Sequence, residues 1–128
     1  MARTAITTDK IAKPAGPFSP GIRAGDTLYL SGQVAQDPVT GTLIAGDVVA
    51  QTERIFRNIE ATLQAAKLTL DHVIKVNVYL TDMKNYAAMN EVYVEFFGEA
   101  KPARTTVAVA FALPGIKVEI DAIAYKPR

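Results

Sequence analysis

The stretch PARTTVAVAFALPGIKVEIDAIA, residues 102–124, places two charged side chains among small and apolar ones. Arg104 stands at the start of one apolar segment, and Glu119 stands in the middle of another. Charged side chains are rarely buried without a partner, so each of these positions calls for a structural or functional reason. A planar guanidinium binds a carboxylate group through two parallel N–H donors. The pair therefore suits a site for a small substrate that carries a carboxylate.

The composition restricts the class of protein that can contain such a site. The 128 residues fit a single domain, residues 1–128, that is large enough for a core of its own. Fourteen basic and thirteen acidic residues give a net charge of +1, which argues against a nucleic-acid or anionic-membrane partner. Zero cysteines exclude a disulfide framework, a nucleophilic or redox thiol and a thiolate metal site. No apolar run matches a membrane span or a secretory signal, so we expect a cytoplasmic protein.

Hydrophobic patterning predicts an α+β domain that contains both strands and helices. We expect two helices, residues 47–66 and 83–97, with Asp47 and Asp82 as N-caps and Gly98 as the stop signal. The segment 23–26 reads as a turn, and the proline-rich segment KPAGPFSPG before it reads as a loop. Strands are expected at residues 4–7, 27–33, 42–44, 73–80, 104–111 and 117–124. The order of these elements implies one mixed sheet with both helices on one face.

Such a sheet has no helix left to cover its second face. In the last strand, apolar residues alternate with a second set that is partly apolar: Val118, Ile120, Ala122 and Ala124 against Glu119, Asp121, Ile123 and Tyr125. The central strand alternates in the same way, with Ile74, Val76, Val78 and Leu80 expected on one face. Large exposed apolar patches are unusual in monomers, so we predict a homo-oligomer.

The spacing of Arg104 and Glu119 leads to the same expectation. If ALPGI closes a hairpin centred on Pro114, Arg104 lies opposite Ala124 and Glu119 lies opposite Val109. The two side chains are then five residues apart along the sheet, or roughly 16 Å at about 3.3 Å per residue. One pair of side chains cannot easily converge on a small substrate over that distance. We therefore expect the site to combine Arg104 of one subunit with Glu119 of its neighbour.

Several motifs along the whole chain resemble one protein family. The run PARTTVAVAFALPGIKVEI resembles the signature of the RidA (YjgF-type) imine/enamine deaminases. Further matches are GPFSPGIRAGDTLYLSGQ, QTERIFRNIEATLQAA, KVNVYLTDM and NEVYVEFFG. The resemblance implies a chorismate-mutase-like subunit that assembles as a trimeric barrel, with active sites between subunits.

The resemblance also implies a reaction and the residues that perform it. The activity would be that of a 2-iminobutanoate/2-iminopropanoate deaminase, which hydrolyses 2-imino or 2-enamino acids to 2-oxo acids and ammonia without a metal or an organic cofactor. Arg104 would bind the substrate carboxylate, and Glu119 would hold and activate water. The backbone around Thr106 would orient the imine nitrogen. The remaining residues of the cleft would be Phe18, Ser31, Gly32, Tyr86 and Asn90.

Two positions depart from the family pattern. Family members usually have tyrosine at the position of Phe18, and many have cysteine at the position of Thr106. A phenolic hydroxyl is therefore missing here, and a hydroxyl replaces a thiol. The changes leave Arg104 and Glu119 in place but bear on substrate preference.

Other interpretations of the same residues stay open at this stage. Arg104 could form a structural ion pair with Asp121 or Glu119, and Glu119 could face solvent at a barrel rim. The chain could act on a larger enamine or carbamate, or bind small carboxylates without turnover. A ribonuclease-type translation inhibitor is a further alternative, which the near-neutral charge and the lack of tryptophan argue against.

Overall fold

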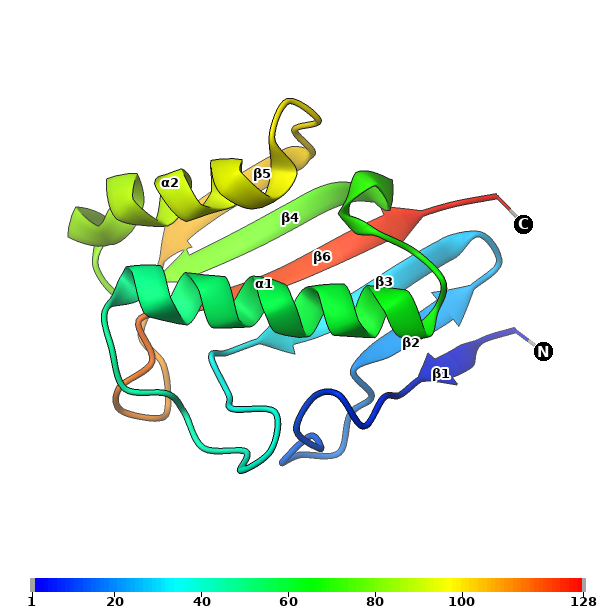
Figure 1. Ribbon diagram of the computed structural model, residues 1–128, viewed down its shortest axis with the longest axis horizontal. Coiled ribbons are helices and arrows are strands. Elements are labelled where there is room, and N and C mark those ends of the chain that lie inside the picture. The colour runs from blue at the N-terminus through cyan, green and yellow to red at the C-terminus, as the bar shows by residue number, and fades with distance from the viewer. Residues whose placement is uncertain (1, 128) are drawn as a thin grey trace.

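Two helices cover one face of a six-stranded sheet in the computed structural model, which describes residues 2–127 (Figure 1). The helices are α1 (Val48–Ala65) and α2 (Tyr86–Phe97), with two single 3-10 turns, η1 (Leu70–His72) and η2 (Met83–Asn85). The strands are β1 (Thr4–Ile6), β2 (Gly21–Ala24), β3 (Thr27–Gln33), β4 (Val73–Leu80), β5 (Ala103–Ala108) and β6 (Val118–Tyr125). The predicted α+β architecture is confirmed. Within residues 2–127, no helix is long and apolar enough to cross a membrane.

The sheet has the strand order β1-β2-β3-β6-β4-β5 and is mixed. Strands β4 and β5 run parallel, and every other neighbouring pair is antiparallel. The helix α2 connects β4 to β5 as a crossover, which places β5 beside β4 at the sheet edge. The last strand, β6, then fills the centre between β3 and β4.

Local sequence signals explain where the helices begin and end. The Asp47 side chain accepts a hydrogen bond from the Ala50 amide at 2.9 Å and caps α1, as expected. The Asp82 carboxylate accepts from the Lys84 amide at 2.9 Å, but the residues after it form η2, so α2 itself begins only at Tyr86. Gly98 ends α2 with a positive φ of 62°, a conformation that glycine adopts without a steric penalty.

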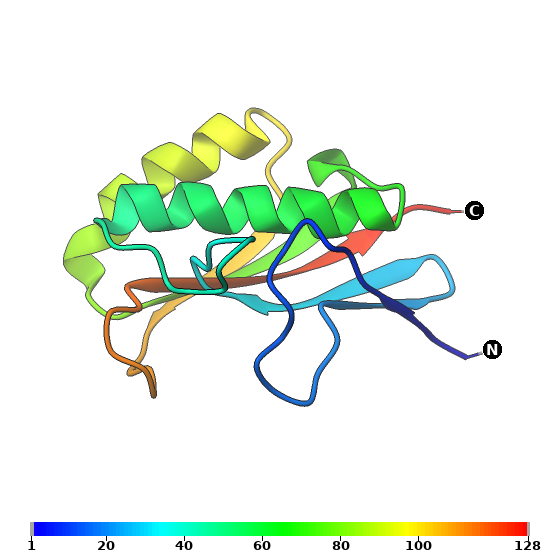
Figure 2. The same cartoon turned by 60° about the horizontal axis from the view of Figure 1, so that its bottom comes forward.

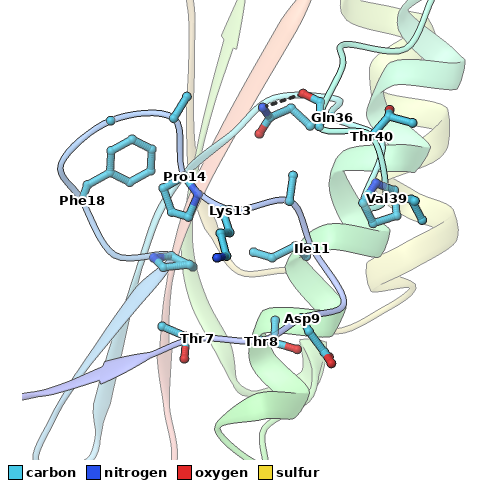
Figure 3. A pocket seen from close by; sticks show the side chains of 16 residues that line it. Thr7, Thr8, Asp9, Ile11, Lys13, Pro14, Phe18, Gln36, Val39 and Thr40 are labelled. Carbon is cyan, nitrogen blue, oxygen red and sulfur yellow. Dashed lines mark hydrogen bonds between the residues drawn. The ribbon is translucent and has the colours of Figure 1, made fainter.

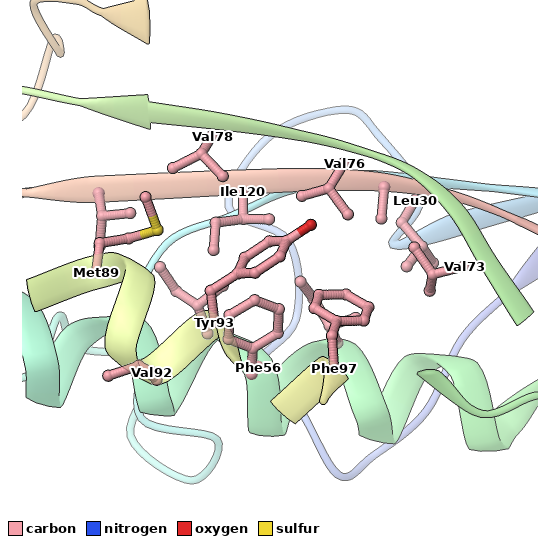
Figure 4. Packing of buried hydrophobic residues seen from close by; sticks show 14 of the residues in the cluster. Leu30, Phe56, Val73, Val76, Val78, Met89, Val92, Tyr93, Phe97 and Ile120 are labelled. Atoms are coloured by element: carbon pink, nitrogen blue, oxygen red, sulfur yellow. The ribbon is translucent and has the colours of Figure 1, made fainter. Parts of the chain in front are cut away.

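The core lies between the helices and the sheet, with Phe56 of α1 at its centre (Figure 4). The Phe56 ring contacts Tyr93 and Phe97 edge-to-face, with centroid distances of 5.9 Å and 5.5 Å. Phe96 stacks on Phe56 at 4.9 Å. Such aromatic contacts stabilise the core in addition to the apolar area that α1 and α2 bury against each other and against the sheet. Tyr93, a member of this cluster, also contacts Arg104 of β5.

The predicted hairpin between the last two strands is wrong. Residues 109–117 connect β5 to β6, but the two strands are separated by β4 and do not pair. Arg104 lies opposite Val76 of β4 rather than opposite Ala124. The hairpin prediction assumes that strands adjacent in sequence are adjacent in the sheet. Here the β4–α2–β5 crossover places β5 at the edge beside β4, and β6 pairs with the other side of β4. The strand is also shorter than predicted and ends at Ala108.

Three smaller expectations fail for local reasons. The sixth strand is β2, not residues 42–44, where the structure has only an isolated bridge between Gln36 and Leu43. The turn expected at residues 23–26 is confined to the end of that segment, where Gly25 has a φ of 59°. A bulge between Val73 and Lys75 turns Ile74 away from the core, so its side chain is exposed.

Within residues 2–127, no helix covers the face of the sheet opposite α1 and α2 (Figure 2). Ile22, Tyr29 and Ile123 lie side by side across β2, β3 and β6 on this face. Tyr29, Tyr125 and Val107 are exposed there. We call this the open face. On the other face of β6, four apolar residues are buried against the helices, as the alternation predicts: Val118, Ile120, Ala122 and Ala124.

Candidate functional site

Arg104 is held in place by two residues of the second helix. Its Nη1 donates to Asn90 Oδ1 at 2.8 Å, and its Nη2 donates to the Tyr86 hydroxyl at 3.0 Å. Tyr86 and Asn90 are four residues apart on α2, so both side chains reach the same side of the helix. The structure therefore brings together three of the residues that the sequence assigned to the site.

The guanidinium of Arg104 also lies over aromatic rings. Its Cζ atom is 4.7 Å from the centroid of the Tyr93 ring and 5.6 Å from that of Tyr86. Burial raises the pKa of the Tyr93 hydroxyl, and the positive charge of Arg104 acts against that rise. Within residues 2–127, Arg104 forms no ion pair, so the structural pair with Asp121 or Glu119 is wrong. Two of its five N–H donors are used, which leaves donors for a ligand.

A hollow of about 360 Å³ opens beside Arg104. Asn90 and Tyr93 of α2 form one wall, and the segment from Gly98 to Pro102 forms another. Lys101 adds a second positive charge to this lining. Neither Lys101 nor Tyr93 is among the site residues expected from the sequence. The hollow is suited to an anionic group by its charge.

Glu119 lies on the open face, in a second hollow of about 290 Å³. Burial, and next the charge of Asp121 two residues along β6, raise the pKa of Glu119 above its usual value of 4.5. Most of the lining is apolar: Ile11, Ala12, Pro14, Ala15, Phe18, Pro20, Val34, Phe111, Ala112, Leu113 and Ile116. A carboxylate in such a setting is a stronger base than one in water.

Gly32 and Ser31 lie at a bulge of β3 beside Glu119. A Cβ atom at Gly32 would collide with Glu119 Oε2, so the Glu119 side chain keeps its present conformation only beside a glycine. The Ser31 hydroxyl donates to the Ser19 carbonyl at 2.6 Å, which ties the loop before β2 to β3. Ser31 thus holds the loop that carries Phe18, while Gly32 borders the hollow directly.

Phe18 borders both the Glu119 hollow and a larger groove (Figure 3). The groove, of about 1070 Å³, runs between the loop before β2 and the loop of residues 36–41. The Phe18 ring is 53% exposed and packs near Gly16. The ring therefore contributes an apolar wall without a hydroxyl.

A hydrogen-bonded group beside Glu119 was not foreseen from the sequence. Asp121 accepts from Asn77 Nδ2 at 2.9 Å and from the Tyr79 hydroxyl at 2.8 Å. Tyr79 is also the β4 partner of Glu119, and its hydrogen bond to Asp121 raises its pKa. The available sequence signal was the alternation in β4, which places Lys75, Asn77 and Tyr79 on one face of the sheet, the face that also carries Asp121 of β6.

Thr106 follows Arg104 on the helix-facing side of β5, opposite Val78. Its hydroxyl is buried and has no hydrogen-bond partner within the described residues. Strand β5 is the last in the sheet, so part of its backbone has no neighbouring strand to bond. Backbone groups near Thr106 are thus free for a ligand or for another chain.

The hollows beside Arg104 and Glu119 share no lining residue. Arg104 pairs with Val76, which faces the helices, whereas Glu119 pairs with Tyr79 on the open face. One chain therefore does not bring its own Arg104 and Glu119 into a common pocket. Within residues 2–127, no group of three or more His, Cys, Asp or Glu side chains is placed to hold a metal ion.

Comparison with known proteins identifies the family. A family model described as Endoribonuclease L-PSP matches residues 8–126. The chain belongs to this family. It is the family of the RidA and YjgF proteins, so the resemblance of the sequence motifs is confirmed.

Relatives in the Endoribonuclease L-PSP family match over almost the full chain. A RutC family protein of Pyrococcus horikoshii is 50% identical over 121 residues, which are 94% of this chain and 96% of the relative. The 2-iminobutanoate/2-iminopropanoate deaminase of Mus musculus is 38% identical and covers 97% of this chain and 92% of its own length. The crystal structure of E. coli TdcF with bound serine has a TM-score of 0.89 at 35% identity and covers 96% and 98% of the two chains.

Proposed function

We propose that this protein hydrolyses 2-imino acids, or their 2-enamino tautomers, to 2-oxo acids and ammonia. The observation that carries the proposal is the placement of Arg104, whose guanidinium is fixed by Asn90 and Tyr86 and has no acidic partner within the described residues. Such a group binds a carboxylate in one plane. The name of the mouse relative and the serine bound to the E. coli relative support a small amino-acid-like ligand.

Glu119 supplies the base for the reaction. A water molecule beside its carboxylate attacks C2 of the imine, a new C–O bond forms, and Glu119 takes one proton from the water. The proton is passed to the nitrogen of the resulting carbinolamine. Glu119 then takes the remaining hydroxyl proton and passes it to the same nitrogen as the C–N bond breaks, so that ammonia leaves and the C=O bond of the 2-oxo acid forms. An imine carbon is already electrophilic, so the chain's own residues suffice for these steps.

The complete site lies between two copies of the chain in this proposal. Arg104 and Glu119 reach opposite faces of one sheet, and the open face has the apolar surface that a second copy would cover. A contact in which each copy presents Arg104 to the next and Glu119 to the previous one is head-to-tail, and such contacts form a closed ring when the rotation between copies closes. We propose three copies, in keeping with the family resemblance. Backbone groups near Thr106, and Phe18, Ser31 and Gly32 around Glu119, would line the cleft.

The proposal is tested by a coupled assay. A pyridoxal-phosphate threonine dehydratase generates the imine in solution, and the formation of 2-oxobutanoate is followed with and without this protein. We expect the parent to accelerate product formation over the protein-free reaction, and Arg104→Ala to give no acceleration. Equal rates in all three reactions would contradict the deaminase function. A protein that binds 2-oxo acids but gives no acceleration would instead be a small-carboxylate binder.

A larger enamine or carbamate is the second candidate substrate. The observation that favours it is the groove of about 1070 Å³ that meets the Glu119 hollow at Phe18. A larger substrate could extend past the Phe18 ring into this groove. Competition of such a compound against the threonine-derived imine in the same assay distinguishes the two classes.

A further inference from the structure

The connector between β5 and β6 forms one wall of the Glu119 hollow. Phe111, Leu113 and Ile116 of this connector, residues 109–117, line the hollow. The segment 110–116 belongs to no strand, and its backbone turns at Gly115, where φ is 88°. Glu119 itself follows only two residues after the connector ends. The conformation of the connector therefore decides both the shape of the hollow and the direction from which β6 enters it.

The two ends of this connector bond to the end of β4, through Val109 N–H to the Leu80 carbonyl and Thr81 N–H to the Lys117 carbonyl. Gln51 on α1 holds the part that turns at Gly115. Its Nε2 donates to the Gly115 carbonyl at 2.9 Å, and its Oε1 accepts from the Lys117 amide at 3.0 Å. The side chain is 1% exposed, so both contacts are shielded from water. Among the described residues, the bond to Gly115 is the one hydrogen bond that any residue of the segment 110–116 makes.

The position of Gln51 in its helix also requires an explanation. It lies on the buried side of α1, next to Thr52 and one turn before Ile55. A buried amide costs stability unless both its donor and its acceptor are paired, and here the connector backbone pairs both. An apolar side chain would satisfy the packing of α1 as well. The amide is therefore explained by what it does to the connector.

We propose that Gln51 is a positioning residue for the Glu119 site: it fixes the β5–β6 connector from the helix layer and so sets the wall against which the substrate lies. The inference rests on the proposed deaminase function for its effect on turnover. Its structural part, the ordering of residues 109–117, is independent of the reaction.

The test replaces Gln51 by methionine, which has a similar length and no hydrogen-bonding amide. The matched control is Thr52→Val on the same helix, because the Thr52 hydroxyl donates only within α1, to the Val48 carbonyl at 2.6 Å. Hydrogen–deuterium exchange is measured on peptides that span residues 109–118, together with kcat and KM in the coupled assay.

For Gln51→Met we expect exchange of the Lys117 amide, the connector N–H that bonds to Gln51, to rise about tenfold or more, since local opening governs exchange there. We expect kcat/KM to fall about tenfold, since small misplacements of reacting groups have large effects on rate. Thr52→Val should change neither quantity beyond twofold. The inference is overturned if Gln51→Met keeps the exchange and the turnover of the parent, or if Thr52→Val reproduces both changes. If the parent does not hydrolyse the imine, the proposed function fails, and the exchange data alone support or overturn the holding of the connector by Gln51.

Discussion

The side chains of Arg104 and Glu119 project from opposite faces of the same sheet. Arg104 of β5 is the partner of Val76, and Glu119 of β6 is the partner of Tyr79, on the neighbouring strand β4. The two residues are two strands apart and three rows apart along β4, which separates their Cα atoms by roughly 14 Å. A small substrate bound by Arg104 is therefore out of reach of Glu119 in the same chain.

Replacing Arg104 by lysine should lower kcat/KM about 100-fold, because an ammonium cannot make the planar, two-donor contact with a carboxylate. The thermal midpoint should change little, because Asn90 and Tyr86 remain able to accept from lysine. Steady-state kinetics in the dehydratase-coupled assay checks this expectation. The matched control is Arg57→Lys on α1, which alters an exposed arginine paired with Glu60 at 3.1 Å. A kcat/KM for Arg104→Lys as high as that of the control would argue against carboxylate binding by Arg104.

The pH dependence of turnover should report Glu119. The base form is the carboxylate, and burial and Asp121 raise the pKa of Glu119, so kcat/KM should decline as pH falls through a value above 4.5. Removing the neighbouring charge with Asp121→Asn lowers that pKa and should shift the acid limb to lower pH. Rates of 2-oxo acid formation across the pH range check this. Asp71→Asn, at the exposed surface of η1, should leave the limb in place. A limb that moves upward in Asp121→Asn would oppose the assignment.

Adding a hydroxyl with Phe18→Tyr should lower KM for a small imine such as 2-iminopropanoate, whose carboxylate or attacking water the phenol could contact. A new hydrogen bond contributes about 0.5–1.5 kcal/mol, which corresponds to a change of roughly two- to tenfold. Stability should stay within about 0.5 kcal/mol, because the ring is 53% exposed. Phe96→Tyr, on the helix layer, serves as the control and should leave KM unchanged. Identical kinetics for Phe18→Tyr and the parent would remove Phe18 from the substrate site.

A charge on the open face should disrupt association. Ile123→Glu places a carboxylate between Tyr29 and β4, where a second copy would have to bury it. Light scattering coupled to size-exclusion chromatography should show a shift toward single chains, with loss of turnover. Val39→Glu in an exposed loop is the control and should keep the parent's mass. An unchanged mass for Ile123→Glu would mean that the open face is not the contact between copies.

The sequence was sufficient for most of the elements and for the layer arrangement. The period of apolar residues located α1 and the alternation in β6, and the caps Asp47 and Asp82 marked where helical turns begin. The motif residues Arg104, Asn90 and Tyr86, distant in sequence, do meet in space. These features depend on local patterns, which a single sequence contains.

The strand order could not be obtained in the same way. Whether β6 pairs with β5 or inserts between β3 and β4 depends on the crossover through α2 and on competition among several partners. The exposure of Ile74 depends on a bulge that no alternation predicts. The contacts of Asp121 and Gln51 likewise required the register of β6 and the path of the connector.

A site shared between two copies is tested most directly by mixing two variants, Arg104→Ala and Glu119→Ala, and unfolding and refolding them together. Neither variant alone should turn over the imine. If each site takes Arg104 from one copy and Glu119 from the next, random mixing in a closed ring restores about one quarter of the parental sites. Recovery of roughly that fraction of the parent's activity is the predicted result. A mixture as inactive as the two separate variants, under conditions in which mixed assemblies are shown to form, would contradict a site shared between copies.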